Sequence, residues 1–260
     1  MALFSVEHLS VSYARDGHVV PLLRDVRFEL AAGAVYDLVG PSGAGKSTLL
    51  RACALMMERA SGELYLDGAP SSSFTPSEWR RRVCLVPQRA SLVAGTVRDN
   101  LRLPWTLKVN AGERPPADEA LARLLALAEL ADVELGRDVS QLSGGQAARV
   151  ALLRAFATRP AVMLLDEVDA ALDDESACAI GRLTRALVDE RTTCLRIRHR
   201  AADGFASGSF ALRDGRLSYA DNPGVSGDAG CARGFDPADY AALRDLEAER
   251  PRAVGEGARP

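Results

Sequence analysis

The residues with the clearest chemistry lie between positions 40 and 48, where the sequence reads Gly40-Pro41-Ser42-Gly43-Ala44-Gly45-Lys46-Ser47-Thr48. A β-like run at 34–39 precedes them, and a helix-like run at 49–55 follows. Between a strand and a helix, glycines let successive backbone N–H groups converge on a phosphate, and the helix dipole adds to that positive field. Lys46 can supply a charge for the β- and γ-phosphates, and the Ser47 hydroxyl can bind Mg²⁺. The segment therefore predicts a site for a nucleoside triphosphate with Mg²⁺.

Two acids at 166 and 167 follow an apolar run, Ala161-Val162-Met163-Leu164-Leu165. An unbroken hydrophobic run is typical of a central strand in a parallel sheet. At the end of such a strand, Asp166 can hold Mg²⁺ opposite the phosphate loop, and Glu167 can polarise an attacking water. The alternative is that the acids only open the next loop and helix. The phosphate loop in the same chain favours the catalytic interpretation.

A second anion-binding pattern occurs at Ser143-Gly144-Gly145-Gln146, just before a predicted helix at 147–157. Backbone N–H groups at a glycine-rich helix start can hold a phosphate. The alternative is a helix cap with flexible glycines. Two such sites about 100 residues apart raise the question of which phosphate the second one serves.

Three single residues are weaker candidates. Tyr13 stands where a first strand gives way to a turn, so its ring could stack on adenine, although spacing alone favours an ordinary strand aromatic. Gln88 follows a predicted strand at 83–86, and the carboxyl end of a strand in an α/β protein is a usual ligand position. His199 ends a predicted strand at 192–198. Taken alone, such a histidine is more often a surface or core residue.

The elements that must position these residues follow from periodicity. Residues 2–30 alternate in the manner of β-strands, which predicts an antiparallel sheet, and 61–68 adds a strand closed by an Asp-Gly turn. A helix is predicted near 77–82, and a closing hairpin near 207–219. Asp118 is expected to cap an amphipathic helix in a loop-rich, helical stretch that interrupts the α/β pattern.

Composition narrows the class of protein. The 260 residues carry 47% hydrophobic side chains and a formal net charge of −3. The hydrophobic content suffices for a large core, and the charge gives no electrostatic footprint for nucleic acid. There is no apolar run of membrane-spanning length and no secretory leader pattern, so we expect neither a membrane span nor secretion.

The order of these motifs resembles that of an ATP-binding cassette (ABC) ATPase. The resemblance rests on the phosphate loop, Gln88, Leu-Ser-Gly-Gly-Gln at 142–146, the strand and acids at 162–167, and His199. It implies an α/β fold, with a P-loop NTPase (RecA-like) core, an N-terminal antiparallel β subdomain and an inserted α-helical subdomain at about 89–157. The nucleotide-binding domain would span 1–220, leaving a tail at 221–260 with one short helix near 237–249.

The resemblance also implies a role for each matching residue. Tyr13 would stack on adenine, Gln88 would sense Mg²⁺ and the attacking water, and Lys46 and His199 would stabilise the γ-phosphate. Asp166 would hold Mg²⁺ together with Ser47, and Glu167 would be the general base. Ser143, Gly144 and Gly145 would grip the γ-phosphate of ATP held by the other protomer. Gln146 and Asp173, the latter as the D-loop aspartate, would also belong to the nucleotide site.

The implied partners are a second copy of the chain, bound head-to-tail around ATP, and a separate transmembrane permease; no nucleic acid is expected. The chain would then be cytoplasmic and peripheral on the inner face of the cell membrane. The stretch from Thr96 to Trp105 is similar to a bacterial subgroup that exports iron or other metals. A repair-type cassette would need a coiled-coil or zinc insertion, which the sequence lacks, whereas a regulatory ATPase with low turnover stays open.

The sequence departs from the family pattern in two places near the site. Val168-Asp169-Ala170-Ala171 replaces the usual Pro-Thr-Ser-Ala, and Arg196 and Arg198 occupy a strand that is normally apolar. Arg198 takes the place of the usual Thr or Ser before His199. Asp37, within the strand before the phosphate loop, is also unexpected and has no explanation from the sequence.

Overall fold

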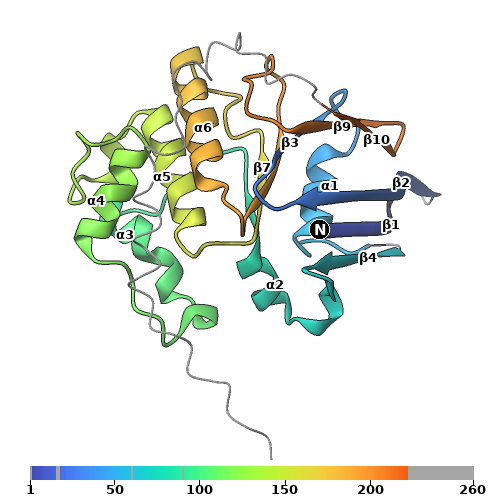
Figure 1. Cartoon of the computed structure of the whole chain (residues 1–260), viewed down its shortest axis with the longest axis horizontal. Coiled ribbons are helices and arrows are strands. Elements are labelled where there is room, and N and C mark those ends of the chain that lie inside the picture. Colours follow the sequence, from blue (N-terminus) through green and yellow to red (C-terminus); the bar gives the residue numbers. More distant parts are fainter. Residues whose placement is uncertain (1, 16–17, 60, 90, 222–260) are drawn as a thin grey trace, which may run out of the picture.

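The fold is taken from a computed structural model that describes residues 2–15, 18–59, 61–89 and 91–221 (Figure 1). The predicted tail helix near 237–249 lies outside the described residues. Within them, the chain forms two β-sheets and a group of helices that gathers on the side away from the N-terminal strands (Figure 1).

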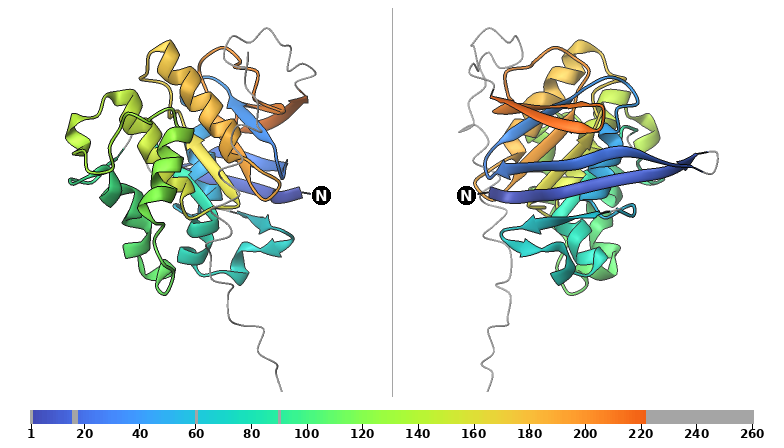
Figure 2. Two further views of the ribbon diagram at one scale, coloured as in Figure 1. Left: turned by 60° about the vertical axis from the view of Figure 1, so that its left-hand side comes forward. Right: turned by 90° about the vertical axis from the view of Figure 1, so that its right-hand side faces the viewer.

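The first sheet is antiparallel, with the strand order β2-β1-β4-β5. Its strands are β1 (Ala2–Arg15), β2 (His18–Ala31), β4 (Ser61–Leu66) and β5 (Ala69–Pro70). The long β1–β2 hairpin projects from the molecule as two blue strands (Figure 2). Alternate residues such as Phe4, Val6 and Leu64 are buried, which is the period-two pattern that predicts a sheet with one covered face. The predicted N-terminal antiparallel sheet is confirmed.

The second sheet has the strand order β10-β9-β3-β8-β7-β6. Its strands are β3 (Val35–Val39), β6 (Val83–Val86), β7 (Val162–Asp166), β8 (Thr193–Ile197), β9 (Gly208–Arg213) and β10 (Arg216–Asp221). All neighbours are parallel except β9 and β10, which form the predicted hairpin. This is the predicted α/β core, and the carboxyl ends of β6, β7 and β8 meet at one edge.

The helices connect these strands. The α-helices are α1 (Lys46–Cys53), α2 (Pro76–Arg82), α3 (Val97–Arg102), α4 (Asp118–Leu127), α5 (Gly144–Phe156) and α6 (Asp174–Leu187). Four short 3₁₀ helices are η1 (Ser71–Ser73), η2 (Leu103–Thr106), η3 (Lys108–Asn110) and η4 (Val139–Gln141). Of the helices in the described ranges, none is long and apolar enough to cross a membrane.

The expectation that Asp118 caps its helix is wrong. Ala117 is the N-cap of α4 and provides no side-chain hydrogen bond, whereas Asp118 is the first helical residue. Its carboxylate instead lies 2.9 Å from Arg98 Nη2 and 3.1 Å from Arg102 Nη2. The acid therefore joins α4 to α3 by ion pairs, and these pairs hold the carboxylate away from the backbone N–H groups of its own helix.

The parallel sheet is covered on both faces by separate hydrophobic clusters. Val162 and Leu164 of β7 pack into the cluster that contains α1 and the antiparallel sheet. Met163 and Leu165 pack into the cluster that contains α5 and α6. Since successive side chains of a strand point to opposite faces, α1 lies on one face of the sheet, and α5 and α6 lie on the other.

Candidate functional site

The predicted phosphate loop runs from Gly40 to Gly45 between β3 and α1. Gly40 has φ +152°, and a Cβ there would lie 2.3 Å from the carbonyl oxygen of Leu212. Only glycine fits this position, because β9 passes so close to the loop. Gly45, the N-cap of α1, has φ +100°. The loop is thus shaped by two glycines in conformations that other residues rarely adopt.

The side chain of Lys46 lies inside this loop. Its Nζ donates hydrogen bonds to the carbonyl oxygens of Gly40, at 2.9 Å, and Pro41, at 3.0 Å. The residue is buried, with 5% of its surface exposed. The loop therefore holds the ammonium group in the space that its backbone encloses, where a phosphate oxygen would meet it.

Ser47 and Asp166, the two residues predicted to bind Mg²⁺ through oxygen, are in contact at the carboxyl end of β7. The Ser47 hydroxyl, in the first turn of α1, donates to Asp166 Oδ1 at 2.8 Å, although the residues are 119 positions apart in the sequence. Asp166 is buried at the carboxyl end of β7. A hydroxyl and a carboxylate are hard oxygen ligands of the kind that Mg²⁺ prefers, so this pair fits the ion.

Glu167 is contacted on both carboxylate oxygens. Gln88 Nε2 donates to Oε2 at 3.0 Å, and His199 Nε2 lies 2.8 Å from Oε1. An ionised carboxylate only accepts hydrogen bonds, so the contact with His199 is a hydrogen bond when the imidazole carries its proton on Nε2. Glu167 has φ +52°, a backbone conformation uncommon for a residue with a side chain. The structure thus brings three of the predicted residues together, and it places Gln88 on Glu167 rather than on the pair of Ser47 and Asp166.

The Ser-Gly-Gly segment begins α5, on the opposite face of the sheet from α1. Ser143 is the N-cap: its hydroxyl accepts from the backbone N–H of Gln146 at 3.2 Å, and the Gln146 side chain accepts from the Ser143 N–H at 3.0 Å. A Cβ at Gly145 would lie 2.4 Å from Ser176 Oγ, so α5 can approach α6 closely only because this residue is glycine. The segment therefore serves as a helix cap, and its exposed Ser143 and Gly144 remain accessible to a ligand.

Asp173 and Tyr13 occupy two further predicted positions. Asp173 caps α6 and accepts from the Ser176 N–H at 2.8 Å; this backbone hydrogen bond lowers the pKa of Asp173. Because Ser176 also touches Gly145, the starts of α5 and α6 lie side by side. Tyr13 lies near the tip of the β1–β2 hairpin opposite Val20, and its side chain is exposed, as stacking on a base would require.

A buried ionic network was missed by the sequence reasoning. It links five residues: Asp37, Arg196, Asp203, Arg198 and Asp169. Arg196 donates to Asp37 at 2.6 Å and to both carboxylate oxygens of Asp203, at 2.7 and 2.8 Å. Burial would raise the pKa of Asp203, but the two guanidiniums more than offset that effect, and its pKa lies below the usual range. The sequence shows these charged residues among apolar neighbours. It does not show which acid pairs with which arginine, because the partners come together only in the folded chain.

Fold and site together define a P-loop α/β protein that binds nucleoside triphosphate. The family model described as "ABC transporter" matches residues 23–170, which contain the phosphate loop, the Ser-Gly-Gly segment and both acids. The chain belongs to the ABC transporter family, as an ATPase that binds and hydrolyses ATP.

This chain aligns with most of the length of two relatives. The Bacillus subtilis protein YjkB, named as an ABC transporter ATP-binding protein, is 36% identical over 79% of this chain and 81% of its own. The Escherichia coli protein FetA, named as an iron export ATP-binding protein, is 34% identical over 65% of this chain and 74% of its own.

Other relatives are longer. The chain spans about a third (33%) of a Lactococcus lactis multidrug resistance ATP-binding and permease protein, with 32% identity over 75% of this chain. Among solved structures, the dimeric structure of the bacterial ABC transporter cassette MJ0796 superposes with a TM-score of 0.72 and 25% identity, over 85% of this chain and 99% of that one.

Proposed function

We propose that this chain is the ATP-hydrolysing subunit of a transporter whose membrane-spanning part is a separate permease, and that two copies close around ATP. The observation that carries the proposal is the convergence at one sheet edge of the Ser47–Asp166 pair with Glu167, Gln88 and His199. Relatives such as YjkB and FetA, of which this chain covers most, support a subunit that acts with a separate permease. The chain would then lie in the cytoplasm, on the inner face of the membrane.

In this proposal, hydrolysis is an in-line attack of water on the γ-phosphate. Glu167 accepts the proton of the water once Gln88 and His199 have left its carboxylate, and His199 and Lys46 then hold the γ-phosphate charge. Ser47 and Asp166 would hold Mg²⁺. The ion would supply positive charge that offsets the negative charge developing on the triphosphate.

The need for two copies follows from the position of the second anion site. The phosphate loop begins α1 on one face of the parallel sheet, whereas Ser143 begins α5 on the other. A triphosphate on the phosphate loop would therefore lie at the start of a helix on the other face of the sheet from the helix that Ser143 begins. In a head-to-tail pair, each Ser143 segment would close over the phosphate loop of the other copy, with ATP between them.

Cysteine crosslinking tests this arrangement. Ser42 and Ser143 are both exposed, and two native thiols, those of Cys53 and Cys194, are buried. We expect that chains carrying S42C, mixed with differently tagged chains carrying S143C, form a covalent heterodimer with a short bismaleimide when ATP is present and hydrolysis is blocked by E167Q. The crosslink should be absent without nucleotide.

Because each chain carries only one of the two added cysteines, every heterodimeric product crosses between subunits. The E167Q chain without added cysteines gives the background from native thiols. If ATP-saturated mixtures yield no more heterodimer than this control, the head-to-tail arrangement is refuted.

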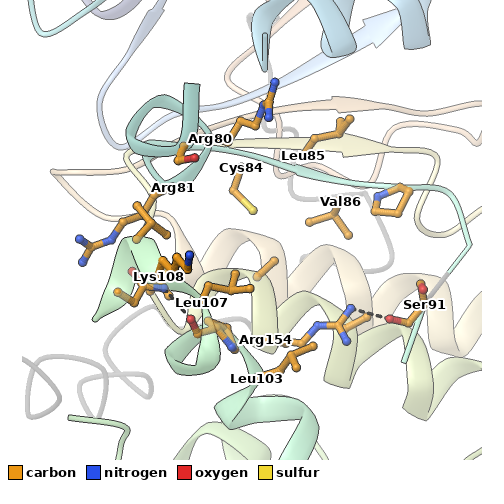
Figure 3. Close-up of a pocket in the computed structure, with 18 of the residues that line it drawn as sticks. Arg80, Arg81, Cys84, Leu85, Val86, Ser91, Leu103, Leu107, Lys108 and Arg154 are labelled. Atoms are coloured by element: carbon orange, nitrogen blue, oxygen red, sulfur yellow. Dashed lines mark hydrogen bonds between the residues drawn. The ribbon is translucent and has the colours of Figure 1, made fainter. Parts of the chain in front are cut away.

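The permease would dock in a pocket of about 620 Å³ that lies between β6 and the short helices η2 and η3 (Figure 3). Leu85 and Val86 of β6 approach it from one side, and Leu103 and Leu107 from the other (Figure 3). Gln88 is the second residue after the end of β6. A partner seated here would therefore touch the strand that positions the Gln88 contact with Glu167.

The lining of this pocket indicates the chemistry of its partner. Among the described residues that line it, five are basic and none is acidic; the basic residues are Arg80, Arg81, Arg89, Lys108 and Arg154. An amphipathic helix with an apolar face and a few carboxylates fits this combination, which is the helix-in-groove mode of recognition. We propose that a cytoplasmic helix of the permease supplies it.

Substitution of Leu107 tests the docking proposal. Leu107 is 54% exposed and lines the pocket. We expect L107D, which removes apolar contact, to reduce co-purification with a co-expressed multi-span permease encoded beside this chain by about tenfold or more. ATP turnover of the purified chain alone should be unchanged. The matched control is M56D, because Met56 is 57% exposed and lies outside the pocket lining. Equal losses for both variants would refute docking at this pocket.

We further propose that the cargo is iron or another metal ion. The Thr96–Trp105 stretch, similar to the metal-export subgroup, forms α3 and most of η2, and Leu103 and Pro104 within it line the docking pocket. The relative named as an iron export ATP-binding protein supports the same class. Because the pocket selects the permease and the permease selects the cargo, this stretch would set the cargo indirectly.

A further inference from the structure

The buried network forms a chain of alternating charge between two parts of the site. It begins with Asp37 on β3, three residues before Gly40, and ends with Asp169, two residues after Glu167. Between them lie Arg196, Asp203 and Arg198. Every member has less than a tenth of its surface exposed. Ion pairs this deeply buried are screened little by solvent, so they hold their geometry.

Arg198 is the link that reaches the site. Its Nε donates to Asp169 Oδ2 at 3.1 Å, and its Nη1 makes a charge contact of 2.5 Å with Asp203 Oδ2, without hydrogen-bond geometry. The next residue, His199, contacts Glu167. Two neighbouring contacts therefore join the segment after β8 to the segment after β7. Arg198 contacts Asp169, and His199 contacts Glu167.

The backbone alone does not fix His199. The ladder between β7 and β8 ends at the pairing of Asp166 with Ile197, so residues 198 and 199 lie beyond the last paired strand position. On the other side, Asp169 belongs to a tight turn that starts at Glu167, where the Ala170 N–H donates to the Glu167 carbonyl at 3.1 Å. The contact between Arg198 and Asp169 thus joins two segments at the point where strand pairing has ended.

We propose that Arg198 is a positioning residue, which holds His199 in register with Glu167 by bridging Asp169 and Asp203. A Thr or Ser at this place could not span both carboxylates, because its side chain is short and has one hydroxyl donor, whereas the guanidinium of arginine presents five donors in a planar fork. The Asp37–Arg196 pair anchors the network to the strand that carries the phosphate loop. The inference rests on the proposed role of Glu167 and His199 in hydrolysis.

The most informative variant is D169N. With all five groups ionised, the network holds three carboxylates and two guanidiniums, so D169N changes its net charge from −1 to zero. The chain should therefore still fold. We expect turnover per nucleotide-binding site to fall by about 10²-fold, because a small misplacement of a reacting group costs that much, while ATP affinity stays nearly constant. R198T should behave in the same way, and R198K should recover part of the loss.

Imidazole NMR provides a readout of position that is independent of activity. The sequence contains three histidines, His8, His18 and His199, and His8 is held by its own contact of 2.7 Å with Asp25. In ring ¹H–¹⁵N spectra of the nucleotide-free chain, D169N should shift the His199 signals and leave those of His8 and His18 in place. Assignment follows from the H199N spectrum. The control D118N, which breaks an ion pair between α3 and α4, should change neither turnover nor the His199 signals.

The outcomes separate this inference from the proposed function. If D169N lowers the unfolding temperature but keeps wild-type His199 signals and wild-type turnover per site, Arg198 and Asp169 have only a structural role and the inference is overturned. If the E167Q control hydrolyses ATP as fast as wild type, the proposed hydrolysis site itself fails. Shifted His199 signals with reduced turnover in D169N, and partial recovery in R198K, would establish the positioning role.

Discussion

Replacing Glu167 with glutamine should abolish ATP turnover while leaving ATP binding intact. A positioned general base contributes about 10²- to 10⁴-fold to a rate, and an amide cannot take the proton of the attacking water. The substitution conserves size, and Gln88 can turn its own amide to satisfy the new side chain, so the contacts around position 167 should persist. We expect kcat to fall about 10³-fold and the ATP-bound dimer to accumulate.

The measurements are phosphate release, equilibrium binding of ATP, and size-exclusion chromatography with saturating ATP. The control is E190Q, because Glu190 is an exposed acid that follows α6. That variant should match wild type in all three measurements. Wild-type turnover by E167Q would show that Glu167 is not the base, and loss of ATP binding would show that it supports the nucleotide site structurally.

The sequence predicted structure best where a local feature depends only on a residue's own type and on its neighbours in the sequence. At position 40, for example, the backbone conformation and the nearby carbonyl of Leu212 leave no room for a Cβ, so the phosphate loop requires glycine there. The residue type therefore indicates the local geometry. The apolar run that forms β7 and the alternation in β1 and β2 likewise determine strands directly. These features carried the fold class and the choice of Asp166 and Glu167.

Contacts between segments distant in the sequence were beyond that reasoning. The sequence gives no reason for Asp37 within its strand. The pairing of β3 with β8 places it beside Arg196, which is 159 residues away in the sequence. Asp118 was expected to cap α4 because the pattern shows only the helix start, whereas Arg98 and Arg102 compete for its carboxylate. Each case depends on register and packing, which periodicity in one segment does not contain.

Loss of the Lys46 charge should strongly weaken nucleotide binding itself, and not turnover alone. We expect K46M to weaken ATP affinity by about 10²- to 10³-fold, which is the usual effect of removing one partner of a buried, hydrogen-bonded charge pair. Methionine keeps much of the apolar stem, so packing inside the loop is largely retained and the change reports the ammonium group. Lys46 is buried and donates to the carbonyls of Gly40 and Pro41, so its ammonium group is fixed inside the loop.

Equilibrium titration with a fluorescent ATP analogue measures this loss, and competition with unlabelled ATP shows that it concerns the same site. R51M is the matched control, because Arg51 lies on the same helix, near its end, and is exposed. It should bind ATP like wild type. In K46M, the loop carbonyls that now accept from Lys46 would lose this donor and face an incoming phosphate, and the resulting repulsion adds to the lost attraction. A K46M chain that binds ATP as tightly as R51M would therefore exclude the phosphate loop as the nucleotide site.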